Sequence, residues 1–303
     1  MKHYIEKANI LLEALPYIKK FNEKIFVVKF GGHVMIDGEL RKAFIKDVVM
    51  FKFIGINPIV VHGGGPQIDE YLQKLGKTPK FVNGLRVTDE ETMEIVEMVL
   101  VGKINKKIVV DINQMGGKAI GLCGKDANLI IAKQKEPEKG SDINYGSVGE
   151  VTTINSKMLK NLCYGKFIPV IAPVGVDENG KSYNLNADTV AGAIASSLRA
   201  EKLILLTDVE GVKDRDGSLI TSMDEDEITA KISNQVVTGG MIPKIKCCIA
   251  ALKTGVKKTH IIDGRIMHSI LLEIFTQKGV GTEIHLSKDP KEMKEVSGTL
   301  FDR

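Results

Sequence analysis

The segment Ile59–Asp69, with the sequence IVVHGGGPQID, decides the fold that we expect for this chain. Ile59 to His62 have the composition of a short buried strand, and three glycines follow directly. Pro66 then has the fixed φ angle that suits the first turn of a helix. Because the first amides of a helix lack hydrogen-bond partners, such a strand–glycine–helix turn can bind an anion. Taken alone, a glycine cluster more often forms a tight turn without a ligand, and for His62 we expect a structural role.

Predicted strands alternate with predicted helices along the rest of the chain. The clearest apolar runs are Ile25–Phe30, Ile168–Ala172, Leu203–Thr207 and His260–Asp263. This alternation predicts an α/β fold with a mostly parallel sheet covered on both faces by helices. In such sheets, ligands bind beyond the carboxyl ends of the strands. Residues 124–153 are richer in glycine and polar residues, and we expect them to form hairpins that project from the sheet.

Two helices carry further expectations. Residues 7–20 are amphipathic at helical spacing, and Pro16 should kink or break this helix near its end. Its apolar side can pack on its own domain or pair with another subunit. Residues Thr88 to Glu91 have the pattern of a capping box, which predicts a long helix that reaches about Met115.

Composition excludes several classes of protein. The chain has 303 residues and a net charge of +4, with both signs mixed and no basic run, which argues against nucleic-acid binding. Its four cysteines lack metal-type spacing, so we expect reduced thiols and no protein metal site. The sequence contains neither a long apolar run nor a signal-peptide pattern. These features predict a cytoplasmic protein that does not enter a membrane.

Two lysines stand beside glycine pairs in opposite halves of the chain. Lys29 lies near the end of an apolar strand, before Gly31 and Gly32, and Lys244 follows Gly239-Gly240 in the first turn of a predicted helix. Either lysine alone could simply reach into solvent. Together they are typical of a clamp on a transferring phosphoryl group, which needs positioning and positive charge.

Further polar residues stand at predicted helix starts and strand ends. Arg86 follows a glycine and could bind a carboxylate through both arms of its guanidinium group, or lie on the surface. Asn184, Asn186 and Asp188 precede a helix, where they could cap it or line a polar pocket in which Asp188 holds both lysines. Thr207 and Asp208 end a strand and are followed by Val209-Glu210-Gly211, a segment that suits nucleotide contact or a plain turn.

Common nucleotide-binding signatures are missing. The segment GGKAIGLCGKD lacks the first glycine of a phosphate loop, because Ala119 stands there, and Asp126 replaces its Ser or Thr. No GxGxxG pattern follows a predicted strand, which makes a dehydrogenase a poor alternative.

Nine motifs nevertheless occur in an order that resembles the amino acid kinase family over nearly the whole chain. They are VVKFGG, VVHGGGPQI, FVNGLRVTD, GLCGKD, VGEV, NLNAD, LLTDVEGV, TGGMIPK and HIIDGR. The resemblance implies an open, mostly parallel αβα sandwich with an extra N-terminal helix. It also implies three regions: a helix for oligomer contacts at residues 1–24, an amino-acid-substrate lobe at 25–180 and a nucleotide-binding lobe at 181–303.

The resemblance further implies the chemistry. ATP would phosphorylate the γ-carboxylate of N-acetyl-L-glutamate, as in arginine biosynthesis, with Mg²⁺ carried chiefly by the ATP phosphates. The catalytic residues would be Lys29, Lys244 and Asp188. The substrate would be held by Gly64, Gly65, Arg86 and Asn184, and the nucleotide by Gly31, Gly32, Thr207 and Asp208.

The N-terminal helix resembles that of arginine-inhibited members of the family, which assemble as hexamers, each a trimer of dimers. The resemblance implies a homo-oligomer, dimer or hexamer, and an arginine site formed by Tyr17, Lys202, His268, Glu273 and Gly279. A helix followed by a glycine turn explains much of the same segment. One departure is His33, where the family more often has a small residue.

Two other functions stay open from the sequence. The chain could be another kinase of the family, acting on glutamate (glutamate 5-kinase), carbamate or UMP (uridylate kinase). It could also be a non-catalytic sensor that binds arginine, although the presence of both Lys29 and Lys244 speaks against this.

Overall fold

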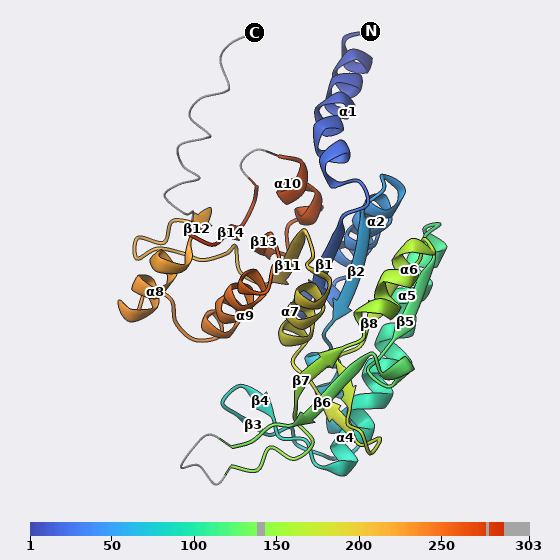
Figure 1. The fold of residues 1–303 in the computed structure, drawn as a ribbon, viewed down its shortest axis with the longest axis vertical. Coiled ribbons are helices and arrows are strands. Elements are labelled where there is room, and N and C mark those ends of the chain that lie inside the picture. Colours follow the sequence, from blue (N-terminus) through green and yellow to red (C-terminus); the bar gives the residue numbers. More distant parts are fainter. Residues whose placement is uncertain (138–142, 277–278, 288–303) are drawn as a thin grey trace.

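A computed structural model of the chain describes residues 1–137, 143–276 and 279–287, without the side chains of Lys7 and His33. The expectation about the ring of His33 therefore lies outside the described part. An eight-stranded sheet forms the centre of the molecule (Figure 1). In spatial order its strands are β12 (Ser222–Met223), β14 (Thr282–Ile284), β13 (Lys258–Asp263), β11 (Lys202–Thr207), β1 (Ile25–Phe30), β2 (Asn57–His62), β8 (Ile168–Ile171) and β5 (Ala119–Leu122).

Neighbouring strands of this sheet run parallel, apart from the antiparallel pair β13–β14. One face packs against α1 (Lys2–Phe21), α2 (Gly38–Phe53), α3 (Gly65–Lys74), α4 (Glu90–Glu97), α5 (Lys106–Gln114) and α10 (Ser269–Phe275). The other face packs against α6 (Ser156–Tyr164), α7 (Ala187–Leu198), α8 (Glu225–Ser233) and α9 (Met241–Lys253). The expected α/β sandwich with its extra N-terminal helix is confirmed.

A smaller sheet extends from one end of the central sheet, below it in Figure 1. Its strands are β10 (Ser182–Asn184), β9 (Val174–Val176), β6 (Ile130–Gln134) and β7 (Gly149–Ile154), and a separate hairpin joins β3 (Phe81–Val82) to β4 (Leu85–Arg86). Short helices occur at η1 (Gly32–Met35) and η3 (Asp126–Asn128). The antiparallel pair β6–β7 confirms the hairpin expected within residues 124–153.

Side-chain alternation along the strands distributes the polar residues between the two faces. Successive strand residues point to opposite faces. In β1, Val28 and Phe30 belong to the core beneath α2, whereas Val27 belongs to the core beneath α7 and α9. Lys29 has the same parity as Val27, so it lies on the face that α7 and α9 cover.

Two helices differ from expectation. Helix α1 continues through Pro16 to Phe21 and does not end at the proline. We attribute this to packing beyond the proline, where Tyr17 contacts the ring of Phe275 and Phe21 contacts that of Phe26. The helix cap expected at Thr88 is instead Asp89, whose side chain accepts a hydrogen bond from the amide of Thr92, and α4 begins at Glu90.

The long helix predicted up to about Met115 is present, but it is not α-helical throughout. Between α4 and α5 the chain forms a π-helical segment, η2 (Met98–Asn105). Among the described residues, no helix combines the length and the apolar composition that crossing a bilayer requires.

Candidate active site

Lys29, Asp188 and Lys244 meet at the carboxyl end of β1. Asp188 is in the first turn of α7 and Lys244 in the first turn of α9, and both helices cover the face to which Lys29 points. Lys29 Nζ lies 3.1 Å from Asp188 Oδ1, and Lys244 Nζ lies 2.5 Å from Oδ2. The structure thus brings together the three residues that the sequence analysis linked to phosphoryl transfer.

The carboxylate of Asp188 is kept ionised by its neighbours. Burial alone would raise its pKa, but the charges of Lys29 and Lys244 hold the pKa of Asp188 below its ordinary value. Only 13% of its side chain is exposed. One negative charge therefore faces two ammonium groups, which leaves net positive charge available for an anionic ligand.

The glycines beside Lys29 allow its ammonium group to fold back over the backbone. A Cβ atom on Gly31 would lie 3.0 Å from Lys29 Nζ, so a side chain there would displace the ammonium group. Gly32 has a positive φ of 67° and begins η1. Next to them, the amide of Gly63 donates to the carbonyl of Phe30 over 2.8 Å, which joins the two glycine turns.

Gly64 and Gly65 begin α3, as the sequence predicted. A Cβ atom on Gly64 would lie 2.5 Å from Leu100 Cδ2 and 2.6 Å from Ile104 Cδ1, so helix packing requires a glycine here. The carbonyl of Gly65 accepts a hydrogen bond from Arg86 Nη2 over 3.2 Å.

Arg86 and Asn184 are linked through Thr88. Arg86 is buried, its Nη1 donates to Asp69, and its guanidinium group lies 4.7 Å from the centre of the Phe81 ring. Thr88 donates to the carbonyl of Arg86 over 2.8 Å and accepts from Asn184 Nδ2 over 3.2 Å. Arg86 is therefore not a surface residue.

Two polar residues serve as structural groups. Asn186 caps α7 by accepting a hydrogen bond from the amide of Thr189. His62 is fully buried, and its two ring nitrogens contact Gly63 O and Asn105 Nδ2. Burial lowers the pKa of His62 to about 4, so the ring is neutral at physiological pH. The structural role expected for His62 is confirmed.

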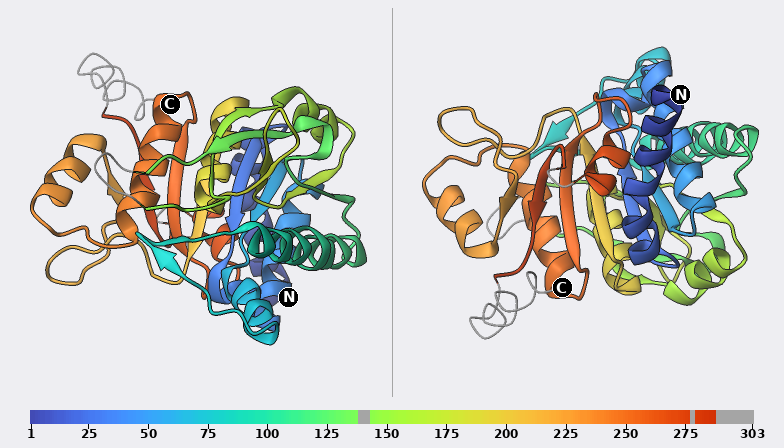
Figure 2. Two further views of the ribbon diagram at one scale, coloured as in Figure 1. Left: turned by 90° about the horizontal axis from the view of Figure 1, so that it is seen from below. Right: turned by 90° about the horizontal axis from the view of Figure 1, so that it is seen from above.

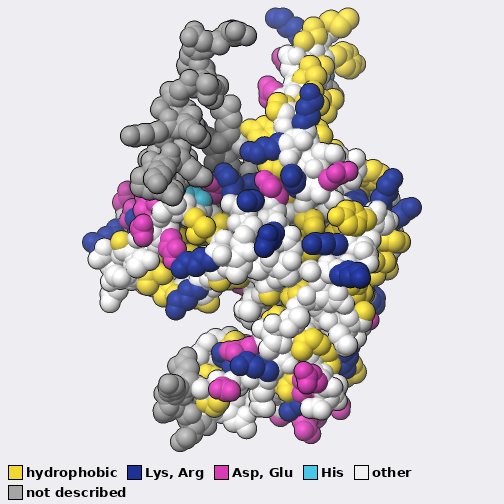
Figure 3. All heavy atoms as spheres, viewed as in Figure 1, with side chains coloured by type: hydrophobic (Ala, Val, Ile, Leu, Met, Phe, Trp, Pro, Cys, Tyr) yellow, Lys and Arg dark blue, Asp and Glu magenta, His cyan; other side chains and the backbone are white. Residues whose placement is uncertain are grey.

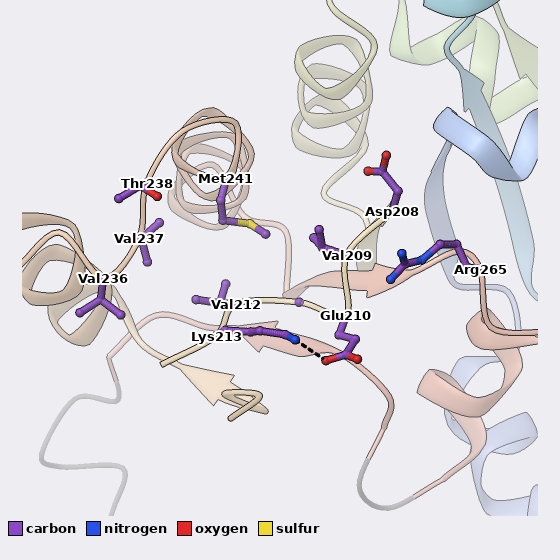
Figure 4. A pocket seen from close by; sticks show the side chains of 11 residues that line it. Asp208, Val209, Glu210, Val212, Lys213, Val236, Val237, Thr238, Met241 and Arg265 are labelled. Carbon is purple, nitrogen blue, oxygen red and sulfur yellow. Dashed lines mark ion pairs between the residues drawn. The ribbon is translucent and has the colours of Figure 1, made fainter. Parts of the chain in front are cut away.

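A pocket of about 370 Å³ opens on the C-terminal half of the molecule (Figure 4). It lies between the loop after β11 and the loop before α9, and Arg265 contributes from the end of β13. Asp208 lines this pocket, whereas Thr207 lies beneath it and bonds to Val209. The lining continues with Val209, Glu210 and Gly211 of the same strand end. It also includes residues that the sequence analysis did not single out: Val212, Lys213, Val236, Val237, Thr238, Met241 and Arg265.

Two of the missed charged residues are already paired in this pocket. Arg265 donates to the carboxylate of Asp263, and Lys213 forms an ion pair with Glu210 over 2.9 Å. The motifs LLTDVEGV, TGGMIPK and HIIDGR contain part of this lining. Their position after β11, before α9 and after β13 was the signal that could have identified it.

The surface between the site residues is hollowed. Figure 3 shows an indentation between the C-terminal half of the molecule and the projection that carries the β3–β4 hairpin. Lys244 belongs to the first of these parts and Arg86 to the second.

A second polar cluster lies on the opposite face of the sheet, beneath α10. Lys202 Nζ lies 2.8 Å from His260 Nε2, and His260 Nδ1 lies 2.7 Å from Glu273 Oε1. Burial lowers the pKa of Lys202 to about 8. A Cβ atom on Gly279 would lie 2.6 Å from Glu273 Oε2, which places this glycine against the same carboxylate.

The other two residues of the expected arginine site lie nearby but have different partners. Tyr17 packs against Phe275 of α10, and α1 lies beside α10 (Figure 2). His268 precedes α10, and its Nδ1 lies 2.5 Å from Asp47 of α2. The structure thus joins Lys202 to Glu273 through His260, which the sequence analysis did not name, and places Gly279 directly against Glu273.

Comparison with known proteins identifies the family of this chain. A sequence profile of the amino acid kinase family matches residues 24–263. The acetylglutamate kinase of Geobacter sulfurreducens is 55% identical over 291 residues, covering 94% of this chain and all of that protein. That of Syntrophus aciditrophicus is 58% identical over 288 residues, covering 93% of this chain and 97% of that protein.

Among solved structures, N-acetylglutamate synthase from Neisseria gonorrhoeae, complexed with coenzyme A and N-acetyl-glutamate, superposes with a TM-score of 0.84 at 24% identity. The superposition covers 98% of this chain and 71% of that one, and it shows a shared fold. The full-length sequence similarity, together with the family profile, decides the classification. The chain belongs to the amino acid kinase family.

Proposed function

We propose that this chain transfers the γ-phosphoryl group of ATP to the γ-carboxylate of N-acetyl-L-glutamate, forming N-acetyl-L-glutamyl 5-phosphate for arginine biosynthesis. The observation that carries the proposal is the pairing of Lys29 and Lys244 with the two oxygens of Asp188. Relatives more than half identical to the chain, named acetylglutamate kinases, support this choice of acceptor. As a kinase, the protein uses ATP as its co-substrate.

Each residue has a separate role in this proposal. Lys29 and Lys244 stabilise the negative charge on the oxygens of the transferring phosphoryl group. Asp188 keeps the two ammonium groups at their places, because its oxygens lie 3.1 Å and 2.5 Å from them. The acceptor carboxylate attacks phosphorus in line with the leaving ADP, and no proton has to be removed from a carboxylate nucleophile.

The two substrates reach this point from different sides. Arg86, Asn184 and the glycines Gly64 and Gly65 hold N-acetyl-L-glutamate on the side of the smaller sheet. ATP lies in the 370 Å³ pocket beside Asp208, and Thr207 shapes the loop after β11 by bonding to Val209. The phosphates of the ATP are directed to Gly31 and Gly32. We propose an amino-acid lobe at residues 25–180 and a nucleotide lobe at 181–303. Asn184 contributes to the acceptor site from the second range, and Gly31 and Gly32 contribute to the nucleotide site from the first.

Mg²⁺ enters the site with the nucleotide. Both oxygens of Asp188 face ammonium groups, so a metal ion bound to them would displace Lys29 or Lys244. We therefore propose that the ATP phosphates carry the ion. When bound, it supplies charge neutralisation on the phosphate oxygens.

We also propose that L-arginine inhibits the enzyme at the cluster beneath α10. Glu273 offers a carboxylate for a guanidinium group. Gly279 packs against this carboxylate and Lys202 approaches it through His260, while Tyr17 and His268 lie nearby at α10. Helix α1 adds contacts between subunits in a dimer or hexamer, because it exposes a row of apolar side chains: Tyr4, Ile5, Ile10, Leu11 and Leu12. Residues 1–24 thus form the oligomer-contact region.

The test is ADP release with a panel of acceptors. We expect turnover with N-acetyl-L-glutamate and none with glutamate, carbamate or UMP, which are the acceptors of related kinases. Turnover with glutamate, carbamate or UMP instead would show that the protein is the kinase specific for that acceptor. Arginine binding without turnover on any acceptor would show that the protein is a non-catalytic arginine sensor.

A further inference from the structure

The π-helical segment η2 contacts the glycine turn at two separate points. Leu100 and Ile104 approach Gly64, as the short distances to a Cβ atom there show. Asn105, the last residue of the segment, contacts His62, which immediately precedes the turn. π-Helical segments are rare and frequently lie at functional sites. This one packs on the turn that we assign to substrate binding.

The side-chain amide of Asn105 has one possible orientation. Its Nδ2 donates to the carbonyl of Val170 over 2.9 Å, and a carbonyl can only accept. Its Oδ1 accepts from Lys106 Nζ over 3.3 Å, and an ammonium group can only donate. A Cβ atom on Gly121 would lie 1.9 Å from this oxygen, so the amide fits only against a glycine.

This orientation fixes the tautomer of His62. Asn105 Nδ2 lies 3.2 Å from His62 Nε2, so Nε2 must accept and cannot carry the hydrogen. The hydrogen of the neutral ring is therefore on Nδ1, which donates to the carbonyl of Gly63 over 2.8 Å. Burial and the nearby charge of Lys106 lower the pKa of His62 to about 4, which keeps the ring neutral.

The hydrogen bond from His62 sets the plane of the peptide between Gly63 and Gly64. The chain contains no cis peptide among its described residues, and in a trans peptide the N–H points opposite to the C=O. With the carbonyl of Gly63 held toward His62, the amide of Gly64 points away from it. That amide has no hydrogen-bond partner among the described residues, so it can donate to a ligand.

We infer that Asn105 is a positioning residue for phosphoryl transfer: through His62 it holds the Gly63–Gly64 peptide so that the Gly64 amide faces the acceptor. The inference rests on the proposed function, because the acceptor is the ligand of this turn. It assigns a task to the π-helical segment, which brings Asn105 beneath β2 and β8. Asn105 itself does not touch the substrate.

The test is the substitution Asn105→Asp, which keeps the shape of the side chain but replaces the donating nitrogen by an oxygen. His62 Nε2 would then face an acceptor, which favours a hydrogen on Nε2 and turns a lone pair on Nδ1 toward the carbonyl of Gly63. We expect kcat/KM for N-acetyl-L-glutamate to fall by about tenfold or more, mainly through KM. The KM for ATP should change by less than about twofold, because the nucleotide pocket lies elsewhere.

The matched control is Asn113→Asp in α5. The side chain of Asn113 only accepts, from the amide of Ala119 over 2.7 Å, so an aspartate preserves its bond. We expect this variant to keep both KM values. If Asn105→Asp lowered the melting temperature but left KM for the acceptor unchanged, Asn105 would stabilise the fold only, and the inference would be wrong.

A measurement on the unaltered enzyme covers the case in which Asn105→Asp does not fold. Nitrogen-15 NMR of the histidine rings should identify His62 as a neutral ring with its hydrogen on Nδ1, assigned as the signal that is lost in His62→Gln. The ring of His260, whose Nδ1 faces Glu273 and whose Nε2 faces Lys202, should give a second signal of this kind that persists in the variant. A hydrogen on Nε2 of His62 would overturn the inference. If instead the unaltered enzyme had no kinase activity, the proposed function would fail while the tautomer could still be observed.

Discussion

Lys244 and Asp188 form an ion pair that joins the first turns of two neighbouring helices, with Nζ 2.5 Å from Oδ2. Cations are unfavourable at helix N-termini, so a lysine in the first turn of α9 requires compensation. Asp188 supplies it from the adjacent helix. The pair keeps the ammonium group at the carboxyl end of the central sheet, where a phosphoryl group can reach it.

Replacing either lysine should therefore remove catalysis without removing the fold. For Lys29→Met and Lys244→Met we expect kcat to fall by about 100-fold or more, because each ammonium group acts on charge that develops during transfer. Steady-state kinetics at saturating ATP would measure this. The control is Lys42→Met, since Lys42 is 61% exposed and pairs with Glu39 on the surface. A lysine variant with normal kcat would show that its lysine has no part in the transfer.

Arg86→Lys tests the acceptor site. A lysine keeps the charge but cannot contact Asp69, Gly65 and a carboxylate with one planar group. We expect KM for N-acetyl-L-glutamate to rise by about tenfold or more, with KM for ATP unchanged. Arg41→Lys is the matched control, because Arg41 pairs with Asp111 away from the site. Equal changes in both KM values would argue against a specific acceptor contact.

The proposed arginine site is tested by Glu273→Gln. This change removes the negative charge opposite His260 and beneath Gly279, and with it the attraction for a guanidinium group. L-Arginine should raise the melting temperature of the unaltered protein and inhibit it, and the variant should need at least about tenfold more arginine for both effects. Glu225→Gln serves as control, because Glu225 at the start of α8 forms an ion pair with Lys253 at the end of α9. Unchanged inhibition in Glu273→Gln would refute this site.

The buried ring of His62 predicts a pH dependence of stability. Its pKa is about 4 in the folded protein, against an ordinary value of 6.5, so the unfolded chain binds the proton first. Above pH 6.5 the ring is neutral in both the folded and the unfolded protein. As the pH falls from 6.5 toward 4, only the unfolded chain protonates His62, so the free energy of unfolding decreases. Across that window the decrease amounts to roughly 3 kcal/mol.

Urea unfolding between pH 4 and pH 7 would measure this decrease. His62→Gln should show a shallower fall of the unfolding free energy in acid than the unaltered protein, whereas His3→Gln, at an exposed position, should not. Identical slopes in the His62 variant and the unaltered protein would contradict the buried neutral ring.

Strand alternation explains why so much of the fold and the site could be predicted. The glycine-ended strands, the helix starts and the two lysines are local patterns, and the parallel sheet brings the carboxyl ends of its strands to one edge. Lys29 shares the parity of Val27 and therefore meets α7 and α9. The parity of Lys202 directs it to the opposite face, toward His260 and Glu273.

Features that depend on contacts between distant segments could not be predicted. The sequence MVLVGKIN contains no local pattern that predicts the π-helical segment η2. Its side chains pack against Gly64 and Gly121, which lie outside the segment in the sequence. Helix α1 passes through Pro16 because residues beyond it pack on α10 and β1. The lining of the proposed nucleotide pocket comes from three separate loops, so no single motif reveals it.

The measurement that tests the central claim most directly is the trapping of the acyl phosphate with hydroxylamine. The protein would be incubated with ATP and N-acetyl-L-glutamate, with Lys244→Met beside it. We expect the hydroxamate of N-acetyl-L-glutamate to form in an amount equal to the ADP released, and to be nearly absent with the variant. ADP release without any hydroxamate, or equal hydroxamate from the variant, would contradict the claim that Lys29, Asp188 and Lys244 transfer a phosphoryl group to this carboxylate.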